Sequence, residues 1–303
     1  MFALLTVSRK DLKNVFNNTV LVLLLIAAVA VWMAIAVRPD DRLHIYFCDV
    51  GQGDAILIKT QQNSQILVDG GPDDKVLECL SQALPFYDHD LDLVILTHPH
   101  ADHLGGLIEV LRTYQIKKLI FWQIPYESAD FQEFVDLVRQ KNLPVEKVVV
   151  GDVLALDQQS RVEVWYPLSD EELKLLGVGF SPYDGEDVND SSIVFRLVCG
   201  NFEVLLTGDA PQSVQELLLQ QGVVKESDVL KVAHQGAKDG LARDFLEKVN
   251  PQLAVISVGE DNRYGHPHAG TLEELQNAGV EVKRTDQDGT IEVVSDCKTW
   301  WVR

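Results

Sequence analysis

Residues 91–106 read LDLVILTHPHADHLGG, and this stretch constrains the fold more than any other in the chain. An apolar run that predicts a buried strand leads directly into His98, His100, Asp102 and His103. His98 and His100 alternate, so both side chains can point the same way from an extended loop. Imidazole and carboxylate groups together suit zinc, manganese or iron. The end of a buried strand is also where α/β sheets commonly bind ligands.

Two other strand ends carry matching side chains. The run FEVLLTGDA ends near Asp209, and the run DVLKVAHQG ends near His234. An aspartate after an apolar run could be a simple turn residue. Beside the histidine cluster, a carboxylate shared by two cations is the better interpretation of Asp209.

The order of the predicted elements indicates two sheets with helices on their outer faces. Short strand-like runs at 43–69 are followed by a helix at 73–84, and Gly105 and Gly106 predict a tight turn into another helix. A second strand-rich part begins near 153. The remaining expected helices lie at 104–114, 129–141, 212–220, 240–249 and 271–278, and strands at 91–97, 117–121, 145–149, 228–233, 253–258, 281–284 and 290–294.

The chain is strongly acidic. Its 26 basic and 46 acidic side chains give a net charge of −20. Residues 1–42 hold five basic and three acidic groups, so residues 43–303 carry −22. A body of this charge repels polyanions at long range, although the local field at a metal site can differ.

An apolar run of 19 uncharged residues, 19–37, lies near the N-terminus. It is about long enough to cross a bilayer as a helix. The basic residues before it predict a cytoplasmic tail at 1–18, a linker at 38–42 and a large domain, 43–303, outside the membrane. A buried core helix and a cleaved signal peptide are the alternatives. We expect an uncleaved single-pass anchor in the cell membrane.

Four cysteines are widely spaced and form no C-x-x-C pair: Cys48, Cys79, Cys199 and Cys297. We expect buried apolar residues. An exported domain could form disulfides, but the sequence does not pair them.

A long acidic segment at 168–190 has seven acidic residues and one lysine. It can be read as a solvated surface loop or as a lid over a pocket.

The motif HPHADH resembles the H-x-H-x-D-H signature of the metallo-β-lactamase superfamily. The wider set is similar to the metallo-β-lactamase domain of ComEC-type DNA-uptake channel proteins. The matching stretches are FCDVGQGDAILI, LVDGG, LTHPHADHLGG, NDSSIVFRL, LLTGDA, LKVAHQGAK and NRYGHPH. They span about 43–285 in the family's order. A single anchor in place of many spans predicts a stand-alone relative.

The resemblance implies an αββα sandwich with a dinuclear metal site at one edge. It assigns His98 and His100 to one cation, Asp102, His103 and His234 to the other, and Asp209 to both. Asp69 in VDGG and Asp49 in FCDVGQGD would support the ligands from behind, which metal sites generally require. Zinc is favoured over manganese.

Two departures from the family pattern concern the ligands. Many superfamily members bring a further histidine between the first motif and the bridging aspartate, and none lies between His103 and His234 here. Instead, Asn189, Asp190 and Ser192 match an ND-x-S element and are assigned to the substrate side. The alternatives are that the first cation is under-coordinated, binds weakly, or uses Asp190 or Asn189 as a ligand. The family often reads HHGS where this chain reads HQGA. Gln235 and Lys231 complete the expected substrate contacts.

The activity implied is metal-assisted hydrolysis. Asp102 would hold the attacking hydroxide, and His266 in RYGHPH would donate a hydrogen bond or a proton to the substrate. The first hypothesis is a phosphodiesterase or nuclease acting on DNA, together with a separate membrane channel subunit. The alternatives are a hydrolase of a small phosphodiester or cell-envelope ester, and an inactive metal-binding partner module.

Overall fold

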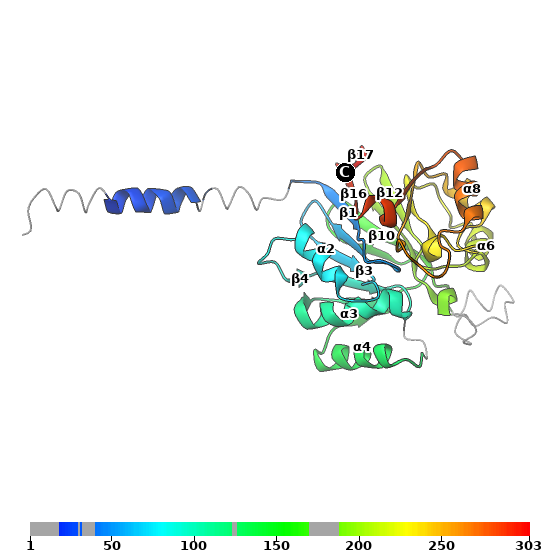
Figure 1. Ribbon diagram of the computed structural model, residues 1–303, viewed down its shortest axis with the longest axis horizontal. Helices are drawn as coiled ribbons and strands as arrows, with labels where there is room; N and C mark the ends of the chain where they lie inside the picture. Colours follow the sequence, from blue (N-terminus) through cyan, green and yellow to red (C-terminus); the bar gives the residue numbers. More distant parts are fainter. Residues whose placement is uncertain (1–17, 30, 32–39, 123–125, 170–187) are drawn as a thin grey trace, which may run out of the picture. The chain divides into compact units, whose positions relative to one another are not determined.

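The structure is a computed structural model, and it describes residues 18–29, 31, 40–122, 126–169 and 188–303. The chain divides into two units, Met1–Asp40 and Asp41–Arg303. In the first unit, residues 18–29 and residue 31 are helical (Figure 1), with exposed apolar side chains. Among the residues described, no helix has the length and apolar character needed to cross a bilayer. Two of the predicted segments lie partly outside the described residues. These are the anchor, at residues 30 and 32–37, and the acidic loop, at residues 170–187.

The second unit contains two large mixed sheets. Within the described residues, the first has the strand order β17-β16-β1-β2-β3-β5-β7-β8, and the second has the order β15-β14-β13-β12-β11-β10-β9. The first sheet consists of β1 (Leu43–Phe47), β2 (Ile56–Lys59), β3 (Gln65–Val68), β5 (Leu93–Leu96), β7 (Leu119–Phe121), β8 (Val145–Glu146), β16 (Ile291–Ser295) and β17 (Trp300–Val302). The second consists of β9 (Val153–Ala155), β10 (Ser160–Tyr166), β11 (Val194–Cys199), β12 (Phe202–Leu206), β13 (Val229–Lys231), β14 (Leu253–Ile256) and β15 (Glu281–Arg284).

Each sheet is antiparallel at one end and parallel at the other. Strands β3, β5, β7 and β8 run parallel, as do β12, β13, β14 and β15. A short parallel pair, β4 (Asp90–Leu91) and β6 (Gln115–Ile116), stands apart. The helices are α2 (Lys75–Ala83), α3 (Ala101–Thr113), α4 (Ala129–Gln140), α6 (Gln212–Gln221), α7 (Arg243–Val249), α8 (Ala269–Asn277) and α9 (Thr285–Asp288), with 3-10 turns η1 (Val188–Ser191) and η2 (Ala233–Gly236).

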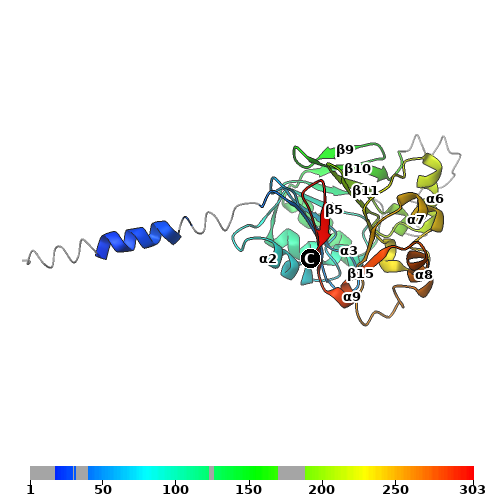
Figure 2. The same cartoon turned by 90° about the horizontal axis from the view of Figure 1, so that it is seen from above.

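The layers follow from the faces of the parallel strands. In β5, Leu93 and Ile95 belong to the core between the sheets, while Val94 and Leu96 pack toward the helices. Both faces are buried, which is why the strand reads as a continuous apolar run. Helices α2, α3 and α4 cover the first sheet, and α6, α7 and α8 cover the second (Figures 1 and 2). The predicted αββα sandwich is confirmed for this unit.

Gly106 corrects one expectation about the histidine motif. Helix α3 already begins at Ala101, so the glycines lie inside the helix and make no turn before it. A Cβ on Gly106 would lie 2.0 Å from the Gly70 carbonyl oxygen and 2.3 Å from that of Asp73. Glycine is therefore needed here because the helix packs directly on the backbone of the loop after β3.

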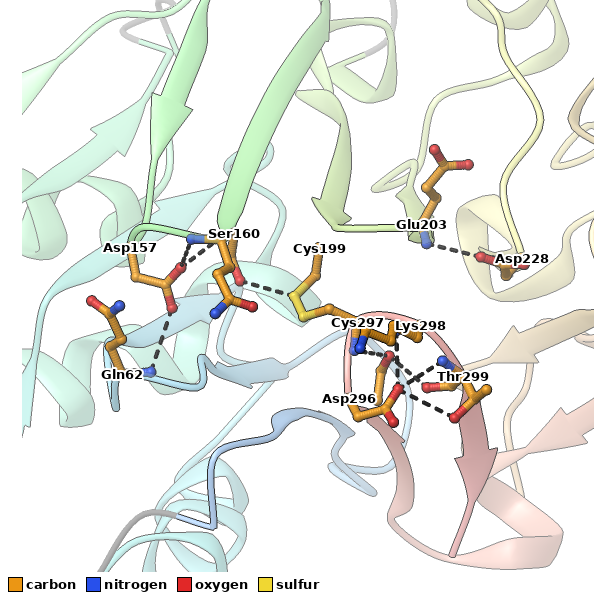
Figure 3. Close-up of a disulfide and its surroundings, with 12 residues drawn as sticks. Gln62, Asp157, Ser160, Cys199, Glu203, Asp228, Asp296, Cys297, Lys298 and Thr299 are labelled. Atoms are coloured by element: carbon orange, nitrogen blue, oxygen red, sulfur yellow. Dashed lines mark hydrogen bonds between the residues drawn. A yellow bond between two sulfur atoms is a disulfide. The ribbon is translucent and has the colours of Figure 1, made fainter.

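The four cysteines are buried, as expected, and they are also paired. Cys48 bonds to Cys79, which ties the end of β1 to α2. Cys199 at the end of β11 bonds to Cys297 in the turn between β16 and β17 (Figure 3). The second disulfide therefore links the two sheets. The Ser160 hydroxyl donates to Cys199 Sγ at 3.3 Å, and Asp296 holds the backbone N–H groups of Lys298 and Thr299 beside it.

Candidate metal centre

The histidine motif lies where β5 ends and α3 begins. The backbone N–H of Thr97 donates to Asp69 Oδ1 and its hydroxyl to Asp69 Oδ2, both at 2.8 Å. This anchors the chain just before the ligands. His100 is the N-cap residue of α3, and His103 lies in the first turn of that helix. The motif is therefore held by a strand on one side and a helix on the other.

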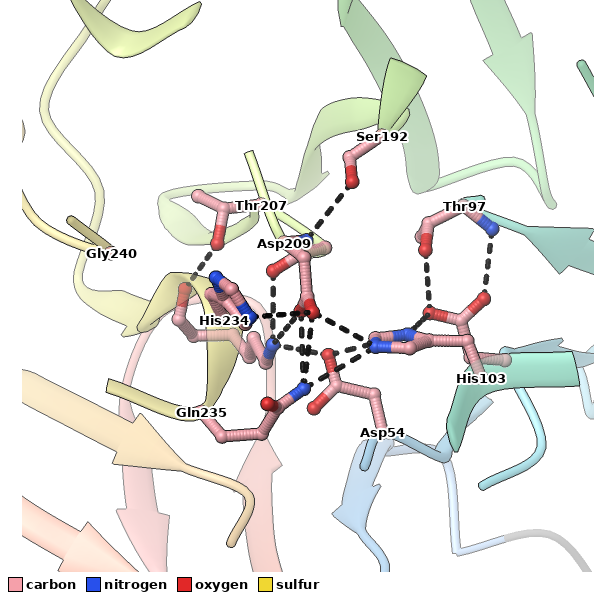
Figure 4. Close-up of polar contacts among 12 residues, drawn as sticks. Asp54, Thr97, His103, Ser192, Thr207, Asp209, His234, Gln235 and Gly240 are labelled. Carbon is pink, nitrogen blue, oxygen red and sulfur yellow. Dashed lines mark hydrogen bonds and ion pairs between the residues drawn. The ribbon is translucent and has the colours of Figure 1, made fainter. Parts of the chain in front are cut away.

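Asp209, which follows β12, lies at the centre of the cluster (Figure 4). Its Oδ2 atom is 3.2 Å from His103 Nε2, 3.9 Å from His98 Nε2 and 4.0 Å from His234 Nε2. One ligand atom each from His98, His103 and Asp209 lies within 4.8 Å of the other two. These three side chains are almost fully buried. Two imidazoles and a carboxylate at this spacing fit a transition-metal cation.

The remaining predicted ligands lie on the more open side of this group. His100 Nδ1 is 3.1 Å from His98 Nε2, and Asp102 Oδ2 is 3.8 Å from His103 Nε2. The side chains of Asp102 and His234 are 33% and 27% exposed to solvent. The structure thus brings all six predicted ligands together, with a buried base and a solvent-facing rim.

Asp69 fixes the orientation of His103. Its Oδ2 atom accepts a hydrogen bond from His103 Nδ1 at 2.8 Å, which leaves Nε2 turned toward Asp209. Asp69 itself is buried and has a left-handed backbone with φ 58°. A carboxylate behind a histidine ligand in this way sets its tautomer and raises its basicity.

Asp54, and not Asp49, is the second carboxylate behind the ligands. Asp49 is exposed; its side chain accepts a hydrogen bond from the Gly51 backbone N–H, and its own backbone N–H donates to the Thr290 hydroxyl. The expected support role is therefore not seen for Asp49. Asp54 is buried, and its Oδ2 is 3.8 Å from His103 Nδ1. The sequence feature that could have indicated the role of Asp54 is its position directly after Gly53. Gly53 has φ 129°, and a Cβ there would lie 2.0 Å from the Asp102 carbonyl oxygen.

Lys231 is a buried counter-charge, which corrects its assignment to the substrate. It is 0% exposed at the end of β13 and makes an ion pair with Asp54. Its Nζ also donates to the Gly208 carbonyl at 3.0 Å and lies 3.8 Å from Asp209 Oδ1. A fully buried ammonium between carboxylates neutralises them and is screened from substrate.

Ser192 also lies behind the ligands, where we expected a substrate contact. Its hydroxyl oxygen accepts from the Asp209 backbone N–H at 3.1 Å and lies 3.3 Å from His98 Nδ1. Ser192 is 0% exposed. Asn189 and Asp190 lie in η1, the former buried and the latter half-buried. Within the ND-x-S element, Ser192 is therefore the residue that contacts Asp209 and His98.

His234 and Gln235 reach the centre through an unusual backbone. Both are left-handed, with φ 51° and 48°, inside η2. Such non-glycine conformations cost of order 1–3 kcal/mol each. Backbone bonds from Ala237 N to His234 O and from His268 N to Gly236 O, both at 2.8 Å, hold the turn. This left-handed backbone conformation directs both side chains toward Asp209.

His266 lies beside His234 at the rim. The two rings meet edge to face, with their centroids 5.4 Å apart. The Asn262 side chain makes two hydrogen bonds to the backbone of His266. Burial and the neighbouring His234 lower the pKa of His266. His268 has a different task, because its side chain caps α8 by accepting from Gly270 N.

Electrostatics prepare the buried ligands for a cation. Burial and the charge of His103 hold the pKa of His98 well below its ordinary value, so this imidazole is neutral. Burial would raise the pKa of Asp209, but His103, His98 and Lys231 together outweigh it and hold this pKa well below its ordinary value. Burial lowers the pKa of His103, yet Asp209, Asp102 and Asp69 raise it well above normal. A cation would displace that proton, because ligands bind metal in their deprotonated form.

The αββα sandwich with this cluster of candidate metal ligands at its strand ends places the chain among proteins of the metallo-beta-lactamase fold. The chain belongs to the metallo-beta-lactamase superfamily, which it matches over residues 48–260.

Two curated relatives and one solved structure are described as examples of the proteins that the chain resembles. It is 30% identical over 268 residues to ComE operon protein 3 of Bacillus subtilis, covering 80% of this chain and 32% of that protein. It is 26% identical over 264 residues to Competence protein ComA of Neisseria gonorrhoeae, covering 84% and 32%. The chain thus spans about a third of the length of these relatives. The fold also matches the metallo-beta-lactamase fold protein YhfI from Bacillus subtilis, with TM-score 0.51, 15% identity and coverage of 86% and 100%.

Proposed function

We propose that this chain is a metal-dependent phosphodiesterase that cleaves nucleic-acid strands outside the cytoplasmic membrane. The observation that carries the proposal is the convergence of His98, His103 and Asp209, with the more open Asp102 and His234 beside them. The buried base of this cluster suits a cation, and the side chains of Asp102 and His234 at the rim are exposed to solvent, from which a substrate can reach them.

Asp102 and His266 have different proposed roles beside the cation. A bound divalent cation supplies a water of lowered pKa and neutralises charge on the scissile phosphoryl group. Asp102, at the rim, is placed to accept the proton of that water. Gln52 Nε2 lies 3.4 Å from His266 Nδ1. If it donates to that atom, His266 keeps its proton on Nε2. A neutral imidazole of this tautomer suits a hydrogen bond to a phosphoryl oxygen better than proton donation.

Exposed groups at the rim favour a nucleotide substrate. Tyr264 is 58% exposed and stacks on His266, with ring centroids 5.8 Å apart. The Arg263 guanidinium lies 5.2 Å from the Tyr264 ring centroid. An aromatic face with a neighbouring cation can stack a base and meet a phosphate. The resemblance of the sequence motifs to those of DNA-uptake channel proteins supports a DNA substrate.

The proposed location is the outer side of the cell membrane, with residues 19–37 as a single-pass anchor. The two disulfides support an oxidising compartment, because such bonds are rare in the cytosol. A separate membrane channel subunit is the proposed partner if cleavage accompanies DNA uptake.

The test uses the full 303-residue chain. Fluorescent single-stranded DNA, bis(p-nitrophenyl) phosphate and a p-nitrophenyl ester are incubated with Zn²⁺, Mn²⁺ or EDTA. We expect metal-dependent cleavage of both diesters, lost in Asp102→Ala and Asp209→Asn but kept in Asp244→Asn, an exposed aspartate of α7. Cleavage of the small diester alone would replace nucleic acid by a small substrate. Cleavage of the ester alone would overturn the phosphodiesterase proposal.

A further inference from the structure

The amide group of Gln235 lies among the ligands on the Asp102 side of the centre. Its Nε2 atom is 3.4 Å from Asp102 Oδ2 and 3.3 Å from His103 Nε2. It is also 3.3 Å and 3.2 Å from the two carboxylate oxygens of Asp209 (Figure 4). The side chain is buried, with 2% of its surface exposed. Gln235 therefore takes no part in the solvent-facing rim, where we expected a substrate contact.

A hydrogen-bond relay fixes which end of this amide faces the ligands. The Gly259 backbone N–H, which can only donate, donates to Gln52 Oε1 at 3.1 Å. Gln52 Nε2 is thereby turned toward Gln235 and donates to its Oε1 at 3.2 Å. Gln235 Oε1 is thus engaged away from the centre. Its NH₂ group faces Asp102, His103 and Asp209.

An amide NH₂ group is a donor with no free acceptor site, so it cannot coordinate a cation. It satisfies the carboxylates of Asp102 and Asp209 on the side where a second cation would need them. His98, His103 and Asp209 offer three ligand atoms within 4.8 Å of one another without any atom of residue 235. The Gln235 amide nitrogen borders this group at His103 and Asp209, and it separates the group from Asp102. The centre thus offers one group of three ligands and, on the Asp102 side, a position that a hydrogen-bond donor fills.

We propose that this centre binds one divalent cation tightly, at His98, His103 and Asp209, and that the Gln235 amide takes the place of a second. The proposal departs from the dinuclear site that the family resemblance implies, and it concerns a position at which the family often has a histidine and this chain has glutamine. The proposal depends on metal binding at the centre and not on the substrate, so it can fail or succeed independently of the phosphodiesterase proposal.

The experiment counts metal. The full chain is stripped with a chelator, reloaded with Zn²⁺ or Mn²⁺, separated from free metal, and measured by mass spectrometry. We expect about one metal ion per chain in the wild type and about two in Gln235→His and Gln235→Glu, because both variants supply a ligand atom at this position. Gln235→Glu is nearly isosteric, so it tests the idea even if the histidine variant folds poorly.

Two further readouts separate a built site from surface binding. The exposed Gln220, changed to histidine, is the matched control and should keep the wild-type count. Electron paramagnetic resonance of the Mn²⁺-loaded protein should show the spectrum of an isolated ion in the wild type and spin coupling in both position-235 variants. A wild type with two coupled ions, a wild type with none, or variants that stay at one would each overturn the proposal.

Discussion

At the level of single residues, His103 shows how the centre is assembled. Its Nδ1 is bonded to Asp69 and its Nε2 faces Asp209, so both ring nitrogens are assigned. The convergence of the candidate ligands could be predicted from the sequence, because their residue types and their positions after apolar strands indicate a metal site. That they bind a metal stays a prediction. Lys231 could not be assigned correctly, because its burial depends on which side chains the neighbouring strands place around it. The same holds for Asp54, which only the fold brings behind His103.

Removing the charge of Asp69 tests its support of His103. In Asp69→Asn we expect Zn²⁺ affinity to fall by roughly 10–100-fold, the usual effect of losing a partner behind a metal-binding histidine. Competition with a chromophoric chelator measures the dissociation constant. Asp73→Asn, an exposed change nearby, is the control. An unchanged affinity in Asp69→Asn would mean that Asp69 only shapes the loop.

At the level of elements, hydrophobic periodicity predicted most helices and strands. Helix α4 and the strand run before the histidines follow their expected ranges closely, because their apolar patterns are long and bounded by polar residues. Strand β17 escaped prediction. It is three residues long and becomes a strand by pairing with β16. The cysteine pairing was also inaccessible, because it depends on the turn after β16 meeting the end of β11.

The Cys199–Cys297 disulfide should stabilise the contact between the sheets. It closes a separation of 98 residues, against 31 for Cys48–Cys79. We expect the double change Cys199→Ala and Cys297→Ala to lower the free energy of unfolding by about 2–5 kcal/mol, because long closed loops restrict the unfolded chain most. Denaturant unfolding under oxidising conditions measures this. Equal stability of the variant and the wild type would show that packing alone holds the sheets.

At the level of the whole molecule, the negative net charge disfavours binding of a polynucleotide, whereas the candidate site favours a phosphodiester substrate. The net charge of −20 argues against a long basic surface that binds many phosphates of a polynucleotide. The metal centre and the rim around Tyr264 and Arg263 can contact only a short part of a strand. Both sheets and the sandwich could be predicted from the order of elements. The N-terminal anchor stays a prediction, because its second half lies outside the described residues.

This charge predicts weak dependence of catalysis on strand length. We expect kcat/KM for a short single strand to be close to that for a long one, because only the phosphates at the centre are held. The rate should also fall only shallowly between about 50 and 200 mM salt, since few counterions are released. Kinetics on strands of increasing length, at several salt concentrations, measure both. A large preference for long strands with a steep salt dependence would reveal an extended basic contact that the account lacks.

The measurement that tests the account most directly is the initial rate of bis(p-nitrophenyl) phosphate hydrolysis as metal is returned to the stripped protein. We predict no rate without metal, a rise in proportion to bound Zn²⁺ or Mn²⁺, and no rise in Asp209→Asn, whose carboxylate joins the buried ligands. Hydrolysis that survives chelation, or that recovers equally in Asp209→Asn, would contradict the assignment of this cluster as the catalytic metal centre.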